Sequence, residues 1–273
     1  MIRVSAIVST YNSERFFRGR IADLMAQSLF ERGELEIVVV NAGSRQSEAY
    51  YIAGYLKQGI PLTVITSLRE PLYTSWNRGI RIAQGTYITN ANTDDRLCPD
   101  ALSIMADALD NNPDRALVYG DSFVTPTPNA VWGGQYELNT EAPYGERLAW
   151  PDFDPLHLLQ HCTMGPHPLW RKDIHETIGY FDESYMVAGD YEMWLRMAAS
   201  GLTMLHIPDT LGLFYWHSDQ LGRQQAQQSA YESRRAILKH RAAIHALHER
   251  PYPVNGVAHS RSPQSSVLLA QSL

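Results

Sequence analysis

The 273-residue sequence lacks the features that mark several large classes of protein. Its two cysteines, Cys98 and Cys162, have no C-x-x-C spacing, so neither a disulfide framework nor a structural zinc site is expected. No run of about 18 apolar residues predicts a transmembrane helix, and no leader pattern precedes the first strand-like segment. The net charge of −6 does not favour binding of nucleic acid. A cytoplasmic protein is therefore expected, with any membrane contact limited to peripheral association at the inner face.

Short β-branched runs alternate with helical patterns in the first half of the sequence. The runs cover residues 4–9, 36–40, 62–66, 86–90 and 116–119, and the helical patterns cover residues 13–28, 47–57, 74–83 and 99–111. This alternation predicts an α/β fold with a doubly wound, mostly parallel central sheet.

Polar segments follow four of the predicted strands. They are residues 10–14, 41–44, 67–70 and 91–95. Ligands of open α/β sheets bind beyond the carboxyl ends of the strands, where these segments are expected to meet. No phosphate-binding G-x-x-x-x-G-K-[ST] loop occurs among them.

The second half of the sequence has a different character. Residues 122–170 are rich in Pro, Gly, Trp and His, which predicts loops and short strands that cover the sheet edge. A helix over 191–200, strands at 204–207 and 211–216, a long helix over 224–249 and a mobile tail from Arg250 are predicted next. Of the histidines on the long helix, His240, His245 and His248 are predicted to be solvated, and its basic residues to form a charged face.

The turn Asn92-Thr93-Asp94-Asp95 presents two carboxylates directly after a strand. Mg²⁺ and Mn²⁺ prefer oxygen ligands and take one or two carboxylates together with phosphate oxygens, so the turn suits a cation that bridges a diphosphate. A helix N-cap is the alternative, because acidic residues also favour the start of a helix. The turn alone leaves both interpretations open.

Two further residues each have a chemical and a structural interpretation. Asp190 begins a predicted helix, where its carboxylate could act as a general base or as an ordinary N-cap. His217 follows an apolar run and could bind a metal or a phosphate, although a lone histidine among aromatic residues is more often structural.

Six segments in order resemble the family 2 glycosyltransferases. They are residues 4–12 (VSAIVSTYN), 36–44 (EIVVVNAGS), 76–80 (WNRGI) with 83–88 (AQGTYI), 93–95 (TDD), 179–183 (GYFDE), and 189–190 (GD) with 194–196 (WLR). The similarity spans about residues 3–220. Each motif is weak by itself, whereas six of them in this order are strongly specific.

The resemblance implies a GT-A type, Rossmann-like fold, a UDP-, GDP- or dTDP-linked sugar as donor, a divalent cation (Mn²⁺ or Mg²⁺), and inversion at the anomeric carbon. It also implies a role for each matching position. Thr10, Tyr11, Asn12 and Glu14 would line the nucleotide pocket with Asn41 near the base; Arg69 and Asn77 would lie beside the nucleotide or donor sugar; Asn92, Asp94 and Asp95 would form the donor and metal site; His217 would add a metal or diphosphate contact; and Asp190 would be the general base.

One departure concerns the second strand, where the family usually has an acidic pair and this chain has Asn41-Ala42. A carboxylate only accepts hydrogen bonds, whereas an asparagine amide can accept or donate, so recognition of the base is the property affected. The aspartate turn and the Gly189-Asp190 helix start are intact.

The expected organisation is a nucleotide-sugar-binding half (1–121), an acceptor-binding and catalytic-base half of the same domain (122–220), and a C-terminal helix and tail (221–273). The acceptor would be a carbohydrate or glycolipid in polysaccharide or glycoconjugate biosynthesis. A non-catalytic nucleotide-sugar-binding or assembly module is an alternative suggested by Asn41-Ala42. A sugar nucleotidyltransferase is disfavoured because residues 10–14 are not a Gly-rich basic loop.

Overall fold

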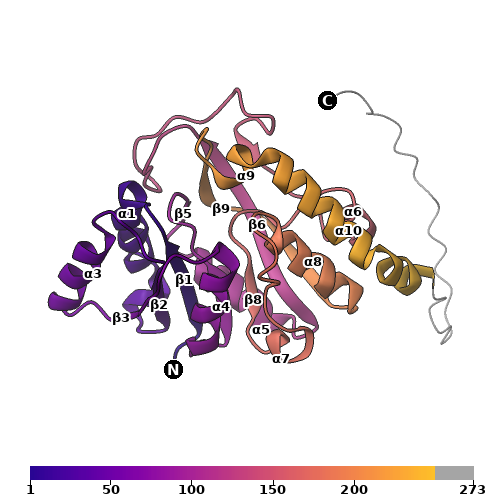
Figure 1. The fold of residues 1–273 in the computed structure, drawn as a ribbon, viewed down its shortest axis with the longest axis horizontal. Helices are drawn as coiled ribbons and strands as arrows, with labels where there is room; N and C mark the ends of the chain where they lie inside the picture. The colour runs from indigo at the N-terminus through magenta and orange to yellow at the C-terminus, as the bar shows by residue number, and fades with distance from the viewer. Residues whose placement is uncertain (250–273) are drawn as a thin grey trace.

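A nine-stranded sheet runs through residues 1–249, the part of the chain that the computed structural model describes (Figure 1). The strand order is β3-β2-β1-β4-β8-β6-β9-β5, and β7 pairs with β6. The strands are β1 Val4–Thr10, β2 Leu35–Asn41, β3 Leu62–Thr66, β4 Tyr87–Asn90, β5 Arg96–Leu97, β6 Arg115–Thr125, β7 Arg147–Leu148, β8 Leu169–Arg171 and β9 Thr203–Tyr215. Strands β1 to β4 are joined in parallel pairs, and β6 pairs in parallel with β9. The predicted α/β fold is confirmed.

Helices cover both faces of the sheet. They are α1 Glu14–Met25, α2 Ser28–Glu31, α3 Glu48–Lys57, α4 Leu72–Ile82, α5 Ala101–Asn111, α6 Pro155–Leu158, α7 Ile174–Ile178, α8 Gly189–Ala199, α9 Leu221–Gln224 and α10 Ala226–Glu249. Because side chains alternate along a strand, Ala6 and Val8 of β1 pack with α1 and α5, whereas Ile7 packs with α4 on the opposite face. None of the helices within residues 1–249 is long and apolar enough to cross a membrane.

Strand β8 joins the two halves of the sheet, which the sequence did not reveal. It lies between β4 and β6 and is antiparallel to both, with Trp170 opposite Ile88 and Leu117. Residues 122–170 were predicted as loops and short strands at the sheet edge, but β8 begins at the end of this region and lies inside the sheet. Three residues are too few to show a strand period. Strand β6 also continues through the expected boundary at residue 121.

A bulge interrupts β9, which was predicted as two separate strands. Ile207 pairs with Gly120 and Thr210 pairs with Asp121, so Pro208 and Asp209 face no residue of β6. Proline has no N–H to donate to a neighbouring strand and is tolerated where pairing is interrupted. One strand with a bulge therefore replaces the two predicted segments.

Helix α10 lies along α8 (Figure 1). His240 is buried on the contact face and its Nε2 lies 2.9 Å from Oε1 of Glu192 on α8, so the prediction that it is solvated was wrong. His245 is exposed, as predicted. The side chain of His248 and the tail from Arg250 lie outside the described residues.

Candidate active site

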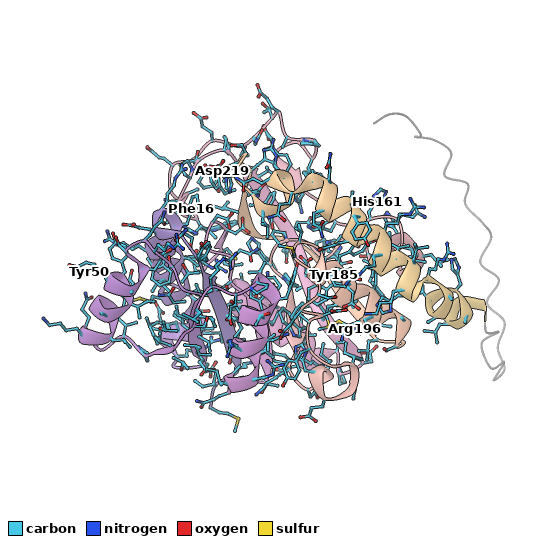
Figure 2. The ribbon with its side chains drawn as sticks, viewed as in Figure 1. Phe16, Tyr50, His161, Tyr185, Arg196 and Asp219 are labelled. Atoms are coloured by element: carbon cyan, nitrogen blue, oxygen red, sulfur yellow. The ribbon has the colours of Figure 1, made fainter. Side chains whose placement is uncertain are left out.

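A cleft of about 1290 Å³ opens at the carboxyl ends of β1, β2 and β4, the edge at which the polar segments were predicted to meet. Ser9, Ala42 and Ala91 mark those strand ends in its wall. The opposite wall comes from the second half of the chain. Phe16 of α1 and Asp219, after β9, both line the cleft and lie at the same edge of the molecule in Figure 2.

Asn12 joins the loops that follow β1 and β2. Its backbone is left-handed (φ 51°), which asparagine tolerates better than most residues. Its Oδ1 accepts a hydrogen bond from the N–H of Arg45 (2.9 Å), and its own N–H donates to Oγ of Ser44 (2.8 Å). Asn12 lines the cleft, but its side-chain oxygen is already bonded to the protein.

Glu14 and Thr10 also support these loops. Glu14 accepts hydrogen bonds from the N–H of Ser47 (3.2 Å) and from the Tyr51 hydroxyl, and the bond from Ser47 is the main reason that the pKa of Glu14 is lowered. Thr10 is buried and bonds to the side chains of Ser13 and Glu48. Glu14 reaches the cleft wall, whereas Thr10 is not among the lining residues.

Tyr11 and Arg69 contact each other in the wall of the cleft. The guanidinium carbon of Arg69 lies 3.9 Å from the centre of the Tyr11 ring, which is a cation–π contact. Both residues line the cleft, and Tyr11 is exposed. A planar base or a phosphate could use this pair, because the ring offers a stacking face and the guanidinium offers donors.

Asn41 lies behind the cleft wall rather than in it. It is 4% exposed, and its Oδ1 accepts the N–H of Ser44 (3.0 Å), which closes the turn after β2. Gly43 in this turn has φ 70°, and a Cβ there would lie 2.7 Å from the backbone nitrogen of Arg69. The turn therefore packs directly on the loop that carries Arg69.

The aspartate turn brings Asp94 to His217, 123 residues later in the chain. Oδ2 of Asp94 lies 3.1 Å from Nε2 of His217, and both side chains line the cleft. His217 is fixed by stacking on Tyr215 (ring centres 4.3 Å apart, 15° between planes) and by contact with Phe16. The structure thus joins two residues that the resemblance assigns to one site.

Asp95 points away from Asp94 and into the protein. Oδ1 of Asp95 accepts the N–H of Tyr215 (3.1 Å), and its Oδ2 accepts the Asn92 amide (3.4 Å). Burial, followed by the charge of Asp94, raises the pKa of Asp95 well above its usual range. Although Asp95 contributes to the cleft wall, both of its oxygens are engaged, so its geometry suits a support for the turn better than a metal ligand.

The hydrogen bonds of His217 define its tautomer. The N–H of Asp219 donates to Nδ1 of His217 (3.2 Å), so in the neutral ring the proton is on Nε2, facing Asp94. An Nε2 that carries a proton donates a hydrogen bond and does not bind a metal. Binding of a metal through Nε2 would require the 217–219 turn to release Nδ1.

The residues at the turn fit a divalent cation that shares its coordination with a ligand. Asp94 offers a partly exposed carboxylate, and Asn92 adds an amide beside it. Within residues 1–249 no group of three or more His, Cys, Asp or Glu side chains forms a closed metal site. An open set of this kind suits Mg²⁺ or Mn²⁺, which keep waters and take phosphate oxygens.

Asp190 lines the same cleft from the first turn of α8. Its Oδ1 accepts the N–H of Tyr191 (2.8 Å) and lies 3.2 Å from the hydroxyl of Tyr73 on α4. Burial raises the pKa of Asp190 against the lowering effect of these bonds. A carboxylate with a raised pKa is suited to accept a proton.

Asn77 does not line the cleft. It is 1% exposed, and its amide donates to the carbonyl of Phe181 (2.9 Å) and accepts the N–H of the same residue (3.0 Å). Its Nδ2 also lies 2.9 Å from Oε1 of Glu183. The predicted donor contact is thus replaced by a pair of backbone hydrogen bonds that fix the segment before α8.

Aromatic side chains line the cleft near the end of β9. Trp216 meets Tyr144 edge to face (5.8 Å), and Arg223 of α9 lies 4.5 Å from the centre of the Trp216 ring. Trp150 and Phe214 extend the same wall. Trp170 and Trp194 are buried and do not line the cleft.

Sequence reasoning missed two residues next to Asp190. Tyr73 bonds to the carboxylate itself, and Glu232 of α10 accepts the N–H groups of the loop just before α8. Tyr73 directly precedes the predicted helix 74–83 and lies three residues before Trp76-Asn77, so its closeness to that motif was a usable signal. No feature of the sequence pointed to Glu232, because it lies in a polar helix 42 residues after Asp190.

The proteins that this chain resembles in sequence are glycosyltransferases. The family model described as Glycosyl transferase family 2 matches residues 5–167. An uncharacterized glycosyltransferase of Rickettsia typhi is 27% identical over 198 residues, covering 71% of this chain and 58% of its own. A PGL/p-HBAD biosynthesis glycosyltransferase of Mycobacterium tuberculosis is 28% identical over 167 residues, covering 60% and 58%. The chain therefore spans somewhat over half the length of these relatives.

Solved structures share the fold. Residues 1–349 of S. aureus TarS in complex with UDP-GlcNAc align with a TM-score of 0.66 at 18% identity, over 88% of this chain and 66% of that one. A mannosyltransferase of Pyrobaculum calidifontis in complex with GDP-Man and Mn²⁺ aligns with a TM-score of 0.60 at 16% identity, over 91% and 76%. With a matched family model over more than half of its length and a GT-A type sheet, the chain belongs to the family 2 glycosyltransferases.

Proposed function

We propose that this chain transfers a sugar from a nucleotide-diphosphate donor to a hydroxyl of a carbohydrate or glycolipid acceptor, with inversion at the anomeric carbon. The observation that carries the proposal is the pairing of Asp94 with His217 in a cleft that is also lined by Asp190. One acidic centre suits a cation and a diphosphate, and the other suits proton transfer.

The nucleotide would bind between the loops after β1, β2 and β3. Tyr11 offers a ring face to the base and Arg69 offers charged donors to the phosphates, while the Asn12 and Glu14 bonds keep the loops in place. The structurally similar proteins hold UDP-GlcNAc and GDP-Man, so a uridine or a guanosine diphosphate sugar is the first choice to test.

Asp94, with Asn92 beside it, would hold a divalent cation, which supplies positive charge for the departing diphosphate. His217 would donate from Nε2 to a phosphate oxygen or continue to orient Asp94. Asp95 would keep the turn against β9 through the N–H of Tyr215. The cation and the Nε2–H of His217 would stabilise the negative charge that develops on the leaving group, and the two aspartates would hold the cation and the turn in place.

Asp190 would take the proton of the acceptor hydroxyl. As the proton moves to the carboxylate, the acceptor oxygen forms a bond to the anomeric carbon on the face opposite the phosphate. The bond from that carbon to the phosphate oxygen breaks, and the nucleoside diphosphate leaves with the electron pair. This single displacement accounts for inversion.

The aromatic wall would receive the acceptor. Apolar faces of sugar rings pack on aromatic side chains, and Tyr144, Trp150 and Trp216 line the cleft that also holds Asp190. A role in assembly of a polysaccharide or glycoconjugate is consistent with the mycobacterial relative, whose name places it in PGL/p-HBAD biosynthesis.

A donor panel tests the proposal. Thermal unfolding with UDP-, GDP- and dTDP-linked sugars, with and without Mn²⁺, identifies the donor because a bound ligand raises the unfolding temperature. Transfer of that sugar to saccharide acceptors is then followed by product NMR, which reports the anomeric configuration. Retention of configuration would contradict direct displacement.

A non-catalytic nucleotide-sugar-binding module is the second candidate. It is favoured by Asn41, which is turned into the protein where the family usually has an acidic residue. Tight, cation-dependent donor binding without hydrolysis or transfer to any acceptor would support the module over the enzyme.

A further inference from the structure

The loop just before α8 is held by hydrogen bonds to a residue of α10, more than 40 residues later in the chain. Residue Ala188, at the N-cap of α8, provides no side-chain cap, and the N–H groups at the start of a helix need acceptors. The segment that leads into the helix is held instead by Glu232 of α10. Its carboxylate accepts the N–H groups of Met186, Val187 and Ala188, each at 2.9 Å.

Glu232 is built into the protein rather than placed at its surface. Its exposed fraction is 0%, and the amide of Gln228 one turn earlier donates to its Oε1 (2.7 Å). The three backbone bonds lower the pKa of Glu232 against the effect of burial, so the carboxylate remains charged at neutral pH. A buried carboxylate with four donors fixes the segment that it faces.

The same loop orients the carboxylate of Asp190. The carbonyl of Val187 accepts the hydroxyl of Tyr73 (2.7 Å), and that hydroxyl lies 3.2 Å from Oδ1 of Asp190. The fit is close, because a Cβ on Gly189 would lie 2.7 Å from the Tyr73 ring. A shift of residues 186–188 would therefore move both Tyr73 and the start of α8.

We propose that Glu232 is a positioning residue for the general base: from α10 it fixes the 186–188 loop, and through that loop and Tyr73 it sets the orientation of Asp190. The proposal rests on the proposed function for the role of Asp190. The bonding of Glu232 to the loop does not depend on it. Helix α10 lies beyond the stretch matched by the family model, which ends at residue 167.

Charge adds a second effect that separates positioning from simple packing. Asp190 faces Tyr73 from α4, Cys162 from the segment after α6 and Glu232 from α10. Burial is the main cause that raises the pKa of Asp190, and the negative charge of Glu232 raises it further. Removing this charge should move the acid limb of the pH–rate profile to lower pH. A residue that only fills space would leave that limb unchanged.

Two substitutions test these effects. In Glu232→Gln one oxygen becomes NH₂, which faces at least one backbone N–H, so we expect the turnover number to fall by about 10- to 10²-fold and the acid limb to move to lower pH. In Glu232→Asp the charge stays but the carboxylate is one methylene shorter, so turnover should fall while the limb stays near its wild-type position. Affinity for the nucleotide with Mn²⁺ should stay within about twofold in both.

Arg234→Gln, on an exposed position of the same helix, is the matched control and should match the wild type. Wild-type turnover and an unmoved acid limb in folded Glu232→Gln would overturn the proposal. So would parallel loss of turnover and nucleotide affinity, which indicates general unfolding. Hydrogen exchange at the N–H groups of residues 186–188, expected to be faster in Glu232→Gln, requires no turnover. It therefore tests the loop contact even if the wild type transfers no sugar.

Discussion

The two acidic centres of the cleft are built in different ways. Asp94 lies on a turn directly after β4, and its partner His217 follows directly after β9, so each is positioned by the end of a strand. Asp190 lies at the start of a helix, and its surroundings come from α4 and α10. The first centre is fixed by the sheet and the second by helix packing.

This difference predicts separate effects on ligand affinity and on turnover. Strand ends in a sheet are held by ladders of hydrogen bonds, and the turn that carries Asp94 lies between two strands, β4 and β5, that are both paired in the sheet. The Asp190 site depends on side chains that meet from distant parts of the sequence. Substitutions in the first centre should therefore alter cation and nucleotide affinity, and substitutions in the second should alter turnover.

The largest effect is expected for Asp190→Asn. Loss of a general base should lower turnover by about 10²- to 10⁴-fold, while calorimetry with nucleotide and Mn²⁺ should give wild-type affinity. The variant should unfold at the same temperature as the wild type or a higher one. Burial raises the pKa of Asp190, so the folded protein binds its proton more tightly than the unfolded chain, and the charged form destabilises the folded state as pH rises through that pKa. Full transfer activity in this variant would remove Asp190 from the mechanism.

Asp94→Asn should have the reverse pattern. We expect nucleotide affinity in the presence of Mn²⁺ to fall by about 10²-fold and affinity without the cation to change little, because the lost charge is the one that faces the cation. Calorimetry at several Mn²⁺ concentrations measures both. Equal loss with and without Mn²⁺ would mean that Asp94 contacts the nucleotide rather than a cation.

His217 provides the control within the same centre. Since its Nε2 carries the proton in the observed tautomer, His217→Gln can still donate from an amide and should keep most of the cation-dependent affinity, whereas His217→Ala should lose about tenfold. Loss of cation binding in both variants would show that the imidazole is a metal ligand.

The pH dependence of turnover is a smaller effect that also distinguishes the two centres. Asp190 must be ionised to accept a proton, so turnover should fall about tenfold per pH unit below its pKa, and this limb should lie above the ordinary aspartate value of 3.8 because burial raises the pKa. A pH–rate profile at saturating donor locates the limb. The same limb should persist in Asp94→Asn. A limb that vanishes in that variant would assign it to the cation site.

The smallest effect concerns the support of the donor side. Gly43→Ala places a methyl group 2.7 Å from the nitrogen of Arg69 at φ 70°, so we expect a loss of about 1–3 kcal/mol in the free energy of unfolding together with weaker nucleotide binding. Gly33→Ala has φ 69° and nothing within 4 Å, and it isolates the backbone cost. Equal destabilisation in both, measured by denaturant unfolding, would show that the contact with Arg69 has no effect of its own.

Local patterns in the sequence predicted the sheet, its carboxyl edge and the residues that follow its strands. Asp94, His217 and Tyr11 were found in the cleft wall because each comes directly after a strand. The orientation of side chains was less predictable. Asp95 and Asn41 face inward because their oxygens bond to backbone N–H groups of Tyr215 and Ser44, and no periodic pattern records such bonds.

Contacts between distant residues account for the rest of the difference. Strand β8 is too short to show a period, and its place in the sheet depends on pairing with β4 and β6. Asn77 matched a family motif and was expected beside the donor, but its amide bonds to Phe181, more than 100 residues later. His240 was predicted to be solvated, but it bonds to Glu192 of α8, and Glu232 on the same helix bonds to the loop before α8.

The bulge at Pro208 and Asp209 also determines which face of the sheet each later residue of β9 occupies. Beyond the bulge, the N–H of Tyr215 bonds to Asp95 and the ring of His217 bonds to Asp94. Both contacts depend on the register of β9, because successive residues of a strand point to opposite faces of the sheet. Deleting one residue between Gly212 and Tyr215, where the pairing with β6 is continuous, would reverse that alternation and turn His217 away from Asp94. Length changes in this strand can be accommodated before Gly212, where Pro208, Asp209 and Leu211 lie outside the pairing.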